Sequence, residues 1–387
     1  MSKIIFDGDN VRAKVELSGN DDQSMIVVTF VNTALNPTKD NRGFGHDFLM
    51  ERGISAVHVT VADNHWYQTP DMEPMLTAIR SITARYCRVV TYGSSMGGYG
   101  AAACSEALNA HRIVALNPQI SVDGAKVPWE TRWRTDAAHI TFARDNMEGL
   151  LKKNAELVVA YDPTLAGDAR HAKELLALSH KPMPLIVPFG NHPVTTLMKQ
   201  GKVLSDVAVH LLTGDWSIAE CRRLIRTARG KSSAYFACRG QQRSRRQHEA
   251  AVADLRKAIE MAPKQADYIA RLGALYMRRR DYNAATLQFL TAIRMTPKVS
   301  SFYVQLGQCL LQAKNPAAAR AILLEGARLN DRRADVWVSL FRSQFDLGLI
   351  DEARNSLREL RNTPGANPQV VKEFEEKLEL AGQQPAA

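Results

Sequence analysis

The sequence predicts a protein of two parts: an α/β domain with an eight-stranded, mostly parallel sheet and helices on both faces, followed by an all-α domain of helical repeats. Short apolar runs alternate with helix-length segments as far as about residue 190, which is typical of a buried parallel sheet. From about residue 232 these runs end, and a repeat of 34 residues replaces them. A glycine-rich turn after one apolar run marks the place where chemistry is expected.

Eight runs are expected to form the strands of the first part. The first two alternate polar and apolar residues and lie close together, so they predict an antiparallel hairpin. The later runs are solidly apolar and are separated by helix-length segments, which favours parallel strands. The expected strands are 3–6, 11–17, 25–32, 56–61, 88–92, 112–116, 157–161 and 185–188.

The fifth run leads directly into Gly93-Ser94-Ser95-Met96-Gly97. A G-x-S-x-G sequence between a strand and a helix is the pattern of a nucleophile elbow, which holds a serine hydroxyl at the tip of a strained turn. Gly93 and Gly97 flank Ser95 because a side chain at either position would collide with the turn. A phosphate-binding loop is excluded, since Tyr99 stands where that motif needs a lysine. The alternative is a strand-to-helix turn without chemistry.

A serine nucleophile needs a base and a group that orients the base. His192 directly follows the last expected strand, and we expect it to be the base. Asp162 directly follows the seventh strand and is the expected acid. Asp168, six residues later, and Asp123, after the sixth strand, remain alternatives. Asp168 could instead cap the helix that follows it.

The remaining parts of the expected site follow from strand ends. The backbone N–H of Met96 is the expected oxyanion donor, with a second N–H from Thr33 in the loop after the third strand. An HGGG motif is absent from that loop. Polar and aromatic residues follow the fourth strand, and residues 43–47 (GFGHD) lie near the end of another strand. We expect the residues after the fourth strand to line the substrate pocket, namely His65, Trp66 and Tyr67.

Neither a metal site nor a cofactor is expected. An H-E-x-x-H motif and a tight cluster of cysteine and histidine are both absent from the sequence. The glycine spacing of a dinucleotide-binding turn is absent as well.

The elbow after the fifth of eight strands, and the order Ser95, Asp162, His192, resemble the α/β-hydrolase superfamily over residues 1–215. The resemblance implies ester, thioester or amide chemistry through an acyl-enzyme, by a serine esterase or an acyltransferase. GSSMGGYGA and VALNPQ are also similar to a bacterial hydrolase-like group linked to polysaccharide or glycoprotein export. The expected substrate is a small acyl ester or an acylated glycan. The alternative is a hydrolase-shaped scaffold without turnover.

The second part, 232–381, shows columns of residues in phase every 34 positions. A Leu-Gly pair recurs at Leu272 and Leu306. This pattern resembles the tetratricopeptide repeat, with full repeats near 266–299, 300–333 and 334–366, a degenerate one near 232–265 and a frayed tail at 382–387. The resemblance implies a protein or peptide partner in the concave groove. The columns are Ala251, Ala285, Ala319, Ala353 and Leu255, Phe289, Leu323, Leu357.

The formal net charge of +10 is concentrated between Arg222 and Arg246, a window without acidic residues. We expect a basic connecting helix at 216–231, as one member of a solvent-exposed pair of helices that joins the two parts. Binding of nucleic acid or an anionic surface by this block is a less favoured alternative. The five scattered cysteines, the absence of an apolar leader and the absence of any run of about 18 apolar residues predict a reduced, cytoplasmic protein without a membrane span.

Overall fold

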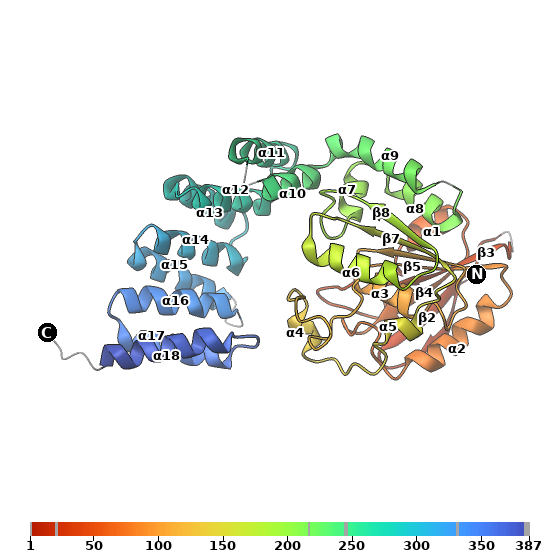
Figure 1. The fold of residues 1–387 in the computed structure, drawn as a ribbon, viewed down its shortest axis with the longest axis horizontal. Coiled ribbons are helices and arrows are strands. Elements are labelled where there is room, and N and C mark those ends of the chain that lie inside the picture. The colour runs from red at the N-terminus through yellow and green to blue at the C-terminus, as the bar shows by residue number, and fades with distance from the viewer. Residues whose placement is uncertain (1, 20–21, 216, 244–246, 330–332, 383–387) are drawn as a thin grey trace. The chain divides into compact units, whose positions relative to one another are not determined.

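The computed structural model describes residues 2–19, 22–215, 217–243, 247–329 and 333–382 (Figure 1). The chain divides into two compact units, Met1–Tyr235 and Phe236–Ala387. All five cysteines are free thiols. Among the described residues, none of the helices has the length and apolar character needed to cross a bilayer. The predicted frayed tail lies, from residue 383 onward, outside the described residues.

The first unit contains the predicted sheet of eight strands, in the order β1-β2-β4-β3-β5-β6-β7-β8. The first two strands form the predicted antiparallel hairpin, and the second also pairs antiparallel with the fourth. All other neighbours are parallel. The strands are β1 (Ser2–Asp7), β2 (Val11–Glu16), β3 (Met25–Phe30), β4 (Ala56–Val61), β5 (Arg88–Ser94), β6 (Arg112–Leu116), β7 (Glu156–Tyr161) and β8 (Pro182–Ile186).

The last strand lies three residues earlier at its start than the apolar run at 185–188 predicts. Its register pairs Pro182 with Leu157 and Pro184 with Val159. Because β8 is an edge strand, each proline lacks an N–H without breaking a ladder inside the sheet. The sequence analysis placed the start of this strand too late because prolines, and not β-branched residues, stand at its first and third positions.

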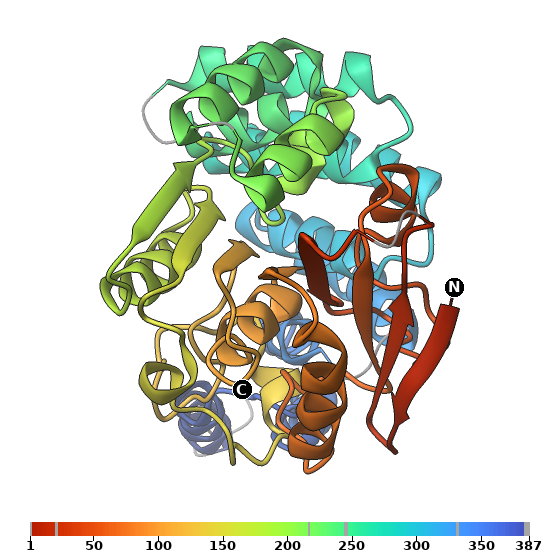
Figure 2. The ribbon, with the colours of Figure 1, turned by 90° about the vertical axis from the view of Figure 1, so that its right-hand side faces the viewer.

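Helices cover both faces of the sheet. Figure 2 shows the strands between the orange helices α2 and α3 on one side and the green helices α8 and α9 on the other. Alternate strand residues form the main core with α2, α3 and α6. The helices of this unit are α1 (His46–Glu51), α2 (Met72–Thr83), α3 (Met96–Ala103), α4 (Arg134–Ala137), α5 (Met147–Leu150), α6 (Ala166–Ala177), α7 (Thr195–Gln200), α8 (Leu204–Thr213) and α9 (Ile218–Ala228).

A helix forms within 216–231 as predicted, but this helix, α9, belongs to the first unit and is not the solvated connector that was expected. The helix packs on β8 and α8, and it buries Cys221 and Ile225. Arg222, from the basic block, donates to the carbonyl of Pro184. One face of this arginine-rich helix is apolar, and that face covers the sheet. The unit accordingly extends to Tyr235 rather than ending at residue 215.

The second unit is built from antiparallel helix pairs, as the 34-residue repeat predicts. The alanine column is fully buried, and Leu255, Phe289 and Leu323 pack beside it. A Cβ on Gly307 would lie 2.4 Å from Leu323, which explains why a glycine follows the leucine there. The first helix of this unit, α10 (Ser233–Arg243), begins in the last residues of the first unit. The other helices are α11 (His248–Met261), α12 (Ala266–Arg278), α13 (Tyr282–Met295), α14 (Ser300–Gln312), α15 (Pro316–Leu329), α16 (Ala334–Asp346), α17 (Ile350–Asn362) and α18 (Pro368–Gly382).

Part of the basic block is neutralised within the second unit. Arg239 and Arg243 both form ion pairs with Asp254, which lies beyond the acid-free window and is buried. Arg245 and Arg246 lie outside the described residues. Because Asp254 pairs with Arg239 and Arg243, the block offers fewer unpaired charges to nucleic acid or an anionic surface than its sequence suggests.

Candidate active site

The turn after β5 has the backbone of a nucleophile elbow. Ser95 has φ 55° and ψ −121°, a conformation that non-glycine residues rarely adopt. A Cβ on Gly93 would lie 2.1 Å from the carbonyl oxygen of Gly97, and one on Gly97 would lie 2.1 Å from that of Phe30. The predicted need for glycine at both positions is therefore confirmed. The turn places the hydroxyl of Ser95 at the carboxyl end of the central strand.

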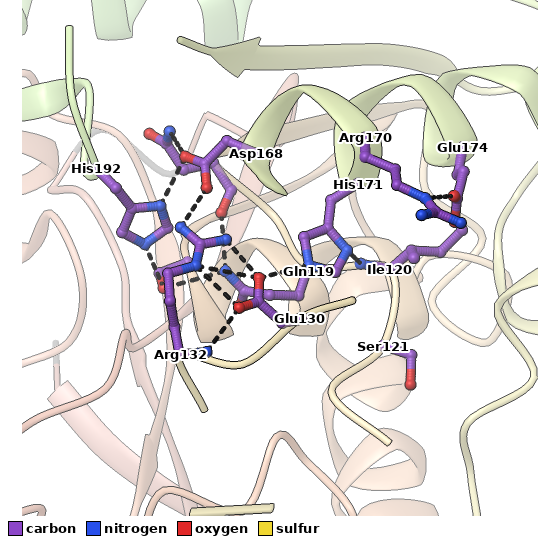
Figure 3. Close-up of polar contacts among 12 residues, drawn as sticks. Gln119, Ile120, Ser121, Glu130, Arg132, Asp168, Arg170, His171, Glu174 and His192 are labelled. Atoms are coloured by element: carbon purple, nitrogen blue, oxygen red, sulfur yellow. Dashed lines mark hydrogen bonds and ion pairs between the residues drawn. The ribbon is translucent and has the colours of Figure 1, made fainter. Parts of the chain in front are cut away.

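His192 reaches Ser95 across 97 positions of sequence. The Nε2 atom of His192 lies 2.9 Å from the Oγ atom of Ser95. The Nδ1 atom of His192 lies 2.8 Å from the Oδ2 atom of Asp168, in the first turn of α6 (Figure 3). Three side chains from the turn after β5, the first turn of α6 and the loop after β8 thus form one chain of hydrogen bonds.

The prediction that Asp162 is the carboxylate beside His192 is wrong. The carboxylate that contacts His192 is that of Asp168, the first alternative. Asp162 is fully buried and accepts hydrogen bonds from the backbone N–H groups of Phe189 and Asn191 at 3.1 and 2.9 Å. It also accepts from the N–H and hydroxyl of Thr164. Asp162 therefore shapes the loop that carries His192, while both ring nitrogens of His192 are engaged elsewhere.

Two donors besides His192 stabilise the ionised form of Asp168. The Nδ2 atom of Asn117 donates to its Oδ2 at 2.7 Å, and a guanidinium nitrogen of Arg132 donates to its Oδ1 at 2.6 Å. Burial raises the pKa of this carboxyl, but the hydrogen bond from His192 and the charge of Arg132 outweigh it, so the pKa is lowered. An ionised Asp168 accepts the Nδ1–H of His192, which leaves Nε2 free to accept the proton of Ser95.

Two buried side chains behind Asp168, Glu130 and His171, fix the partly exposed Arg132 (Figure 3). The guanidinium binds the carboxylate of Glu130, which lies 3.1 Å from the Nε2 atom of His171. His171 accepts the N–H of Ile120 at Nδ1, so its Nε2–H is the atom that faces Glu130. Burial raises the pKa of Glu130, but the hydrogen bonds from His171 and Arg132 exceed this and lower it strongly. The sequence analysis missed this network, because Glu130 and Arg132 lie in a segment without regular structure.

The structure places one of the two expected oxyanion donors, Met96, next to Ser95, and among the described residues it shows no contact between the other, Thr33, and this turn. Met96 is the first residue of α3, so its N–H is among those that have no partner within the helix. The N–H group directly follows Ser95 and lies at the positive end of the helix. Thr33 lies in the half-buried loop after β3, beside Ala34, which exchanges hydrogen bonds with Asn64. No described contact joins Thr33 to the elbow, and its role stays a prediction.

Of the three expected pocket residues, only Trp66 contacts the site. The Nε1–H of Trp66 donates to Gln119, whose Nε2 lies 3.5 Å from the Oγ atom of Ser95. Trp133 stands between Trp66 and His192, with ring centroids 5.5 and 5.9 Å apart. Trp66 is fully buried and supports Gln119 from behind, so the aromatic surface beside His192 is that of Trp133, with Gln119 beside the hydroxyl.

The pocket prediction is wrong for His65 and Tyr67. The hydroxyl of Tyr67 donates to the carbonyl of Val31, and its ring packs edge-on against Phe30 in the core. His65 accepts the N–H of Tyr67 and is buried. Asp123, the other alternative acid, caps a local turn by accepting the N–H of Ala125. The contacts of these side chains stabilise the core and the loops at the strand ends.

Comparison with known proteins finds a family match within the second unit. The tetratricopeptide repeat family matches residues 243–265, within the repeat that the sequence analysis regarded as degenerate. No curated protein matches the chain. Similar solved structures include Pseudomonas aeruginosa pilF (18% identity, 49% of this chain and 90% of that one, TM-score 0.36). A thermophilic TPR protein of Thermus thermophilus is also similar (12% identity, 48% of this chain and 98% of that one, TM-score 0.37). The chain therefore carries a tetratricopeptide repeat at its C-terminal side, and such repeats bind proteins or peptides.

Proposed function

We propose that the first unit is a serine hydrolase or acyltransferase that works through Ser95, His192 and Asp168. The observation that carries the proposal is the continuous chain from the Ser95 hydroxyl through His192 to a buried, ionised carboxylate, with distances of 2.9 and 2.8 Å. A strained nucleophile backbone at the end of a parallel strand supports it further.

The reaction follows from the proton positions. Ser95 attacks the acyl carbonyl carbon while His192 takes the hydroxyl proton at Nε2, and Asp168 stabilises the imidazolium that forms. The carbonyl oxygen becomes an oxyanion, which the N–H of Met96 stabilises at the N-terminus of α3. The imidazolium then protonates the leaving alcohol. Water, or an acceptor hydroxyl, deprotonated by His192, releases the acyl group and restores Ser95.

The substrate class we propose is a small acyl ester or an acylated glycan. The half-buried ring of Trp133 offers an apolar face 5.9 Å from the ring of His192, which suits an acyl chain or the apolar face of a sugar ring. Gln119 offers an amide next to the attacked carbonyl. These groups do not favour an anionic substrate, since Arg132, the cation beside Asp168, is already paired with the two carboxylates of Glu130 and Asp168.

A panel of esters tests this proposal. We expect the purified chain to hydrolyse p-nitrophenyl esters faster than the buffer blank, with a preference for one acyl length, or to release acetate from acetylated sugars. The rate is read from nitrophenolate absorbance and from acetate release. If no ester in the panel is turned over above the blank, the adaptor function below becomes the better account.

The second candidate function is that of an adaptor, and the repeat unit favours it. A cavity of about 590 Å³ lies on α14, α16 and α18 of this unit. Lys314, Arg342 and Lys377 line it together with Asp346, so its walls carry more positive than negative charge. An acidic peptide segment would fit this surface. In the proposed function this unit delivers the hydrolase to its partner, and in the alternative it is the only active part.

A further inference from the structure

A second polar cluster lies on the sheet face opposite α2 and α3. Strand β2 contributes Glu16, strand β4 contributes His58, and α1 contributes His46. The Nε2 atom of His46 lies 2.6 Å from the Oε2 atom of Glu16. One potential ligand atom from each of the three side chains lies within 4.8 Å of the others. The cluster uses residues that the proposed hydrolase reaction does not need.

His58 carries an unexplained nitrogen. The residue is 2% exposed, and its Nδ1 atom lies 2.7 Å from the Oγ1 atom of Thr29. Its Nε2 atom is buried and has no hydrogen-bond partner among the described residues. A buried ring nitrogen without a partner costs free energy unless something binds it. When Nδ1–H is donated to Thr29, Nε2 presents a lone pair, which is the form of histidine that binds metals.

His46 is oriented in the same manner. Its Nδ1 atom lies 2.9 Å from the carboxylate of Asp47, so Nε2 is directed at Glu16. A histidine held by a carboxylate on one nitrogen is the usual arrangement behind a metal-binding nitrogen. Gly43, in the loop before α1, lies directly against the ring of His58, where a Cβ would come within 2.2 Å of it. The loop can therefore approach His58 closely only because this residue is glycine.

We propose that Glu16, His46 and His58 bind one divalent metal ion of the zinc class, with Thr29 and Asp47 orienting the two histidines. Two imidazole nitrogens and one carboxylate suit such ions better than calcium or magnesium, which prefer oxygen ligands. Ligand atoms of a tetrahedral zinc site lie about 3.3 Å apart, so the 2.6 Å contact between His46 and Glu16 opens slightly on binding. The side chain of His46 is 21% exposed and is free to make this movement.

A cavity of about 390 Å³ gives access to the site and is lined by His46 and His58. Three protein ligands leave a fourth position for water or a small ligand. Lys14 forms an ion pair with Glu16 and competes with the metal for that carboxylate. The other charged groups lining the cavity are Arg12, Lys39, Arg42 and Asp40.

A simple ion pair between His46 and Glu16 is the competing explanation. It accounts for the 2.6 Å contact, but it leaves the bare Nε2 of His58 unexplained. It also predicts no effect of Thr29 on any binding event. The two explanations therefore differ in what happens when a metal is added to the stripped protein.

The test uses the full chain after treatment with a chelator. We expect one equivalent of Co²⁺ to produce the visible absorption bands of a tetrahedral site, and Zn²⁺ to displace it. His46→Gln and Glu16→Gln should each weaken Zn²⁺ binding at least about 100-fold, and Thr29→Val about 10-fold to 100-fold. His139→Ala, at an exposed histidine, should leave binding unchanged. Thermal unfolding of each stripped variant checks that it is folded.

The variant Lys14→Gln distinguishes a metal-binding site from a cluster that has only a structural role. Because this change removes a competing cation from Glu16, we expect Zn²⁺ to bind at least about threefold more tightly, whereas loss of a structural contact would weaken binding. The side chain of Lys14 is 43% exposed, so this variant should fold. The absence of stoichiometric binding in the wild type, or equal binding by wild type, His46→Gln and Glu16→Gln, would overturn the proposal.

Discussion

Ser95→Ala lowers kcat for the best ester of the panel by at least about 10⁴-fold, because it removes the nucleophile of the proposed acyl-enzyme. The change deletes one oxygen atom at a position where the strained backbone is set by its neighbours Gly93 and Gly97. We therefore expect the thermal midpoint to be at or above that of the wild type. The measurement is the initial rate at saturating ester, normalised to folded protein.

The chain offers a matched control for this variant. Ser94 is the last residue of β5, is equally buried and directly precedes the nucleophile. Ser94→Ala removes the same atom from the adjoining residue, so it should keep most of the activity. Undiminished turnover in Ser95→Ala would show that this serine is not the nucleophile, whatever the control does.

Asp168→Asn is expected to lower kcat about 10³-fold to 10⁴-fold, because an amide cannot stabilise the imidazolium of His192 and can donate to Nδ1, which selects the wrong tautomer. Asp162→Asn should lower kcat of the folded protein by no more than about tenfold, since this side chain holds the loop of His192 and not its ring. The measurement is kcat for the two variants side by side. Equal losses, or a larger loss for Asp162→Asn, would contradict the assignment of Asp168 as the acid.

A stability measurement distinguishes the role of Asp162. Its carboxylate accepts hydrogen bonds from the N–H groups of Phe189, Asn191 and Thr164, and an amide nitrogen there would face donors. Each lost hydrogen bond to a charged acceptor costs about 1.5–3 kcal/mol. We expect the free energy of unfolding of Asp162→Asn to fall by about 2 kcal/mol or more. A lower free energy of unfolding, with most of the activity kept, is what we expect of a residue that positions a loop.

Local features of the chain made much of this site predictable. The elbow is a contiguous motif whose glycines are required by contacts under 3 Å, so the residue types alone reveal it. His192 lies in the loop after the last strand, and the ends of parallel strands meet at one edge of the sheet. The repeats were predictable because each unit buries the same alanine and leucine positions at a fixed spacing.

Other features depend on contacts that no local pattern shows. Asp162 and Asp168 both follow β7, and only the path of the loop and the first turn of α6 decides which one meets His192. Gln119, Glu130 and Arg132 reach the site from a long irregular segment between β6 and β7. Helix α9 is rich in arginine, and its burial depends on the sheet beneath it.

The cluster of Glu16, His46 and His58 is the clearest case of this kind. The three residues come from two strands and a helix and are separated by 30 and 12 positions, so they match no metal-binding motif. Sequence analysis therefore expected no metal site. Strand register brings Glu16 and His58 to one face of the sheet, and the glycine at position 43 lets α1 place His46 over them.

Labelling with a fluorophosphonate tests the central claim most directly, because this reagent reacts only with an activated serine. The account predicts one adduct per chain, located on Ser95 by peptide mass spectrometry, and its loss in His192→Gln. Failure of the intact wild-type chain to react, or an adduct on another serine, would contradict it.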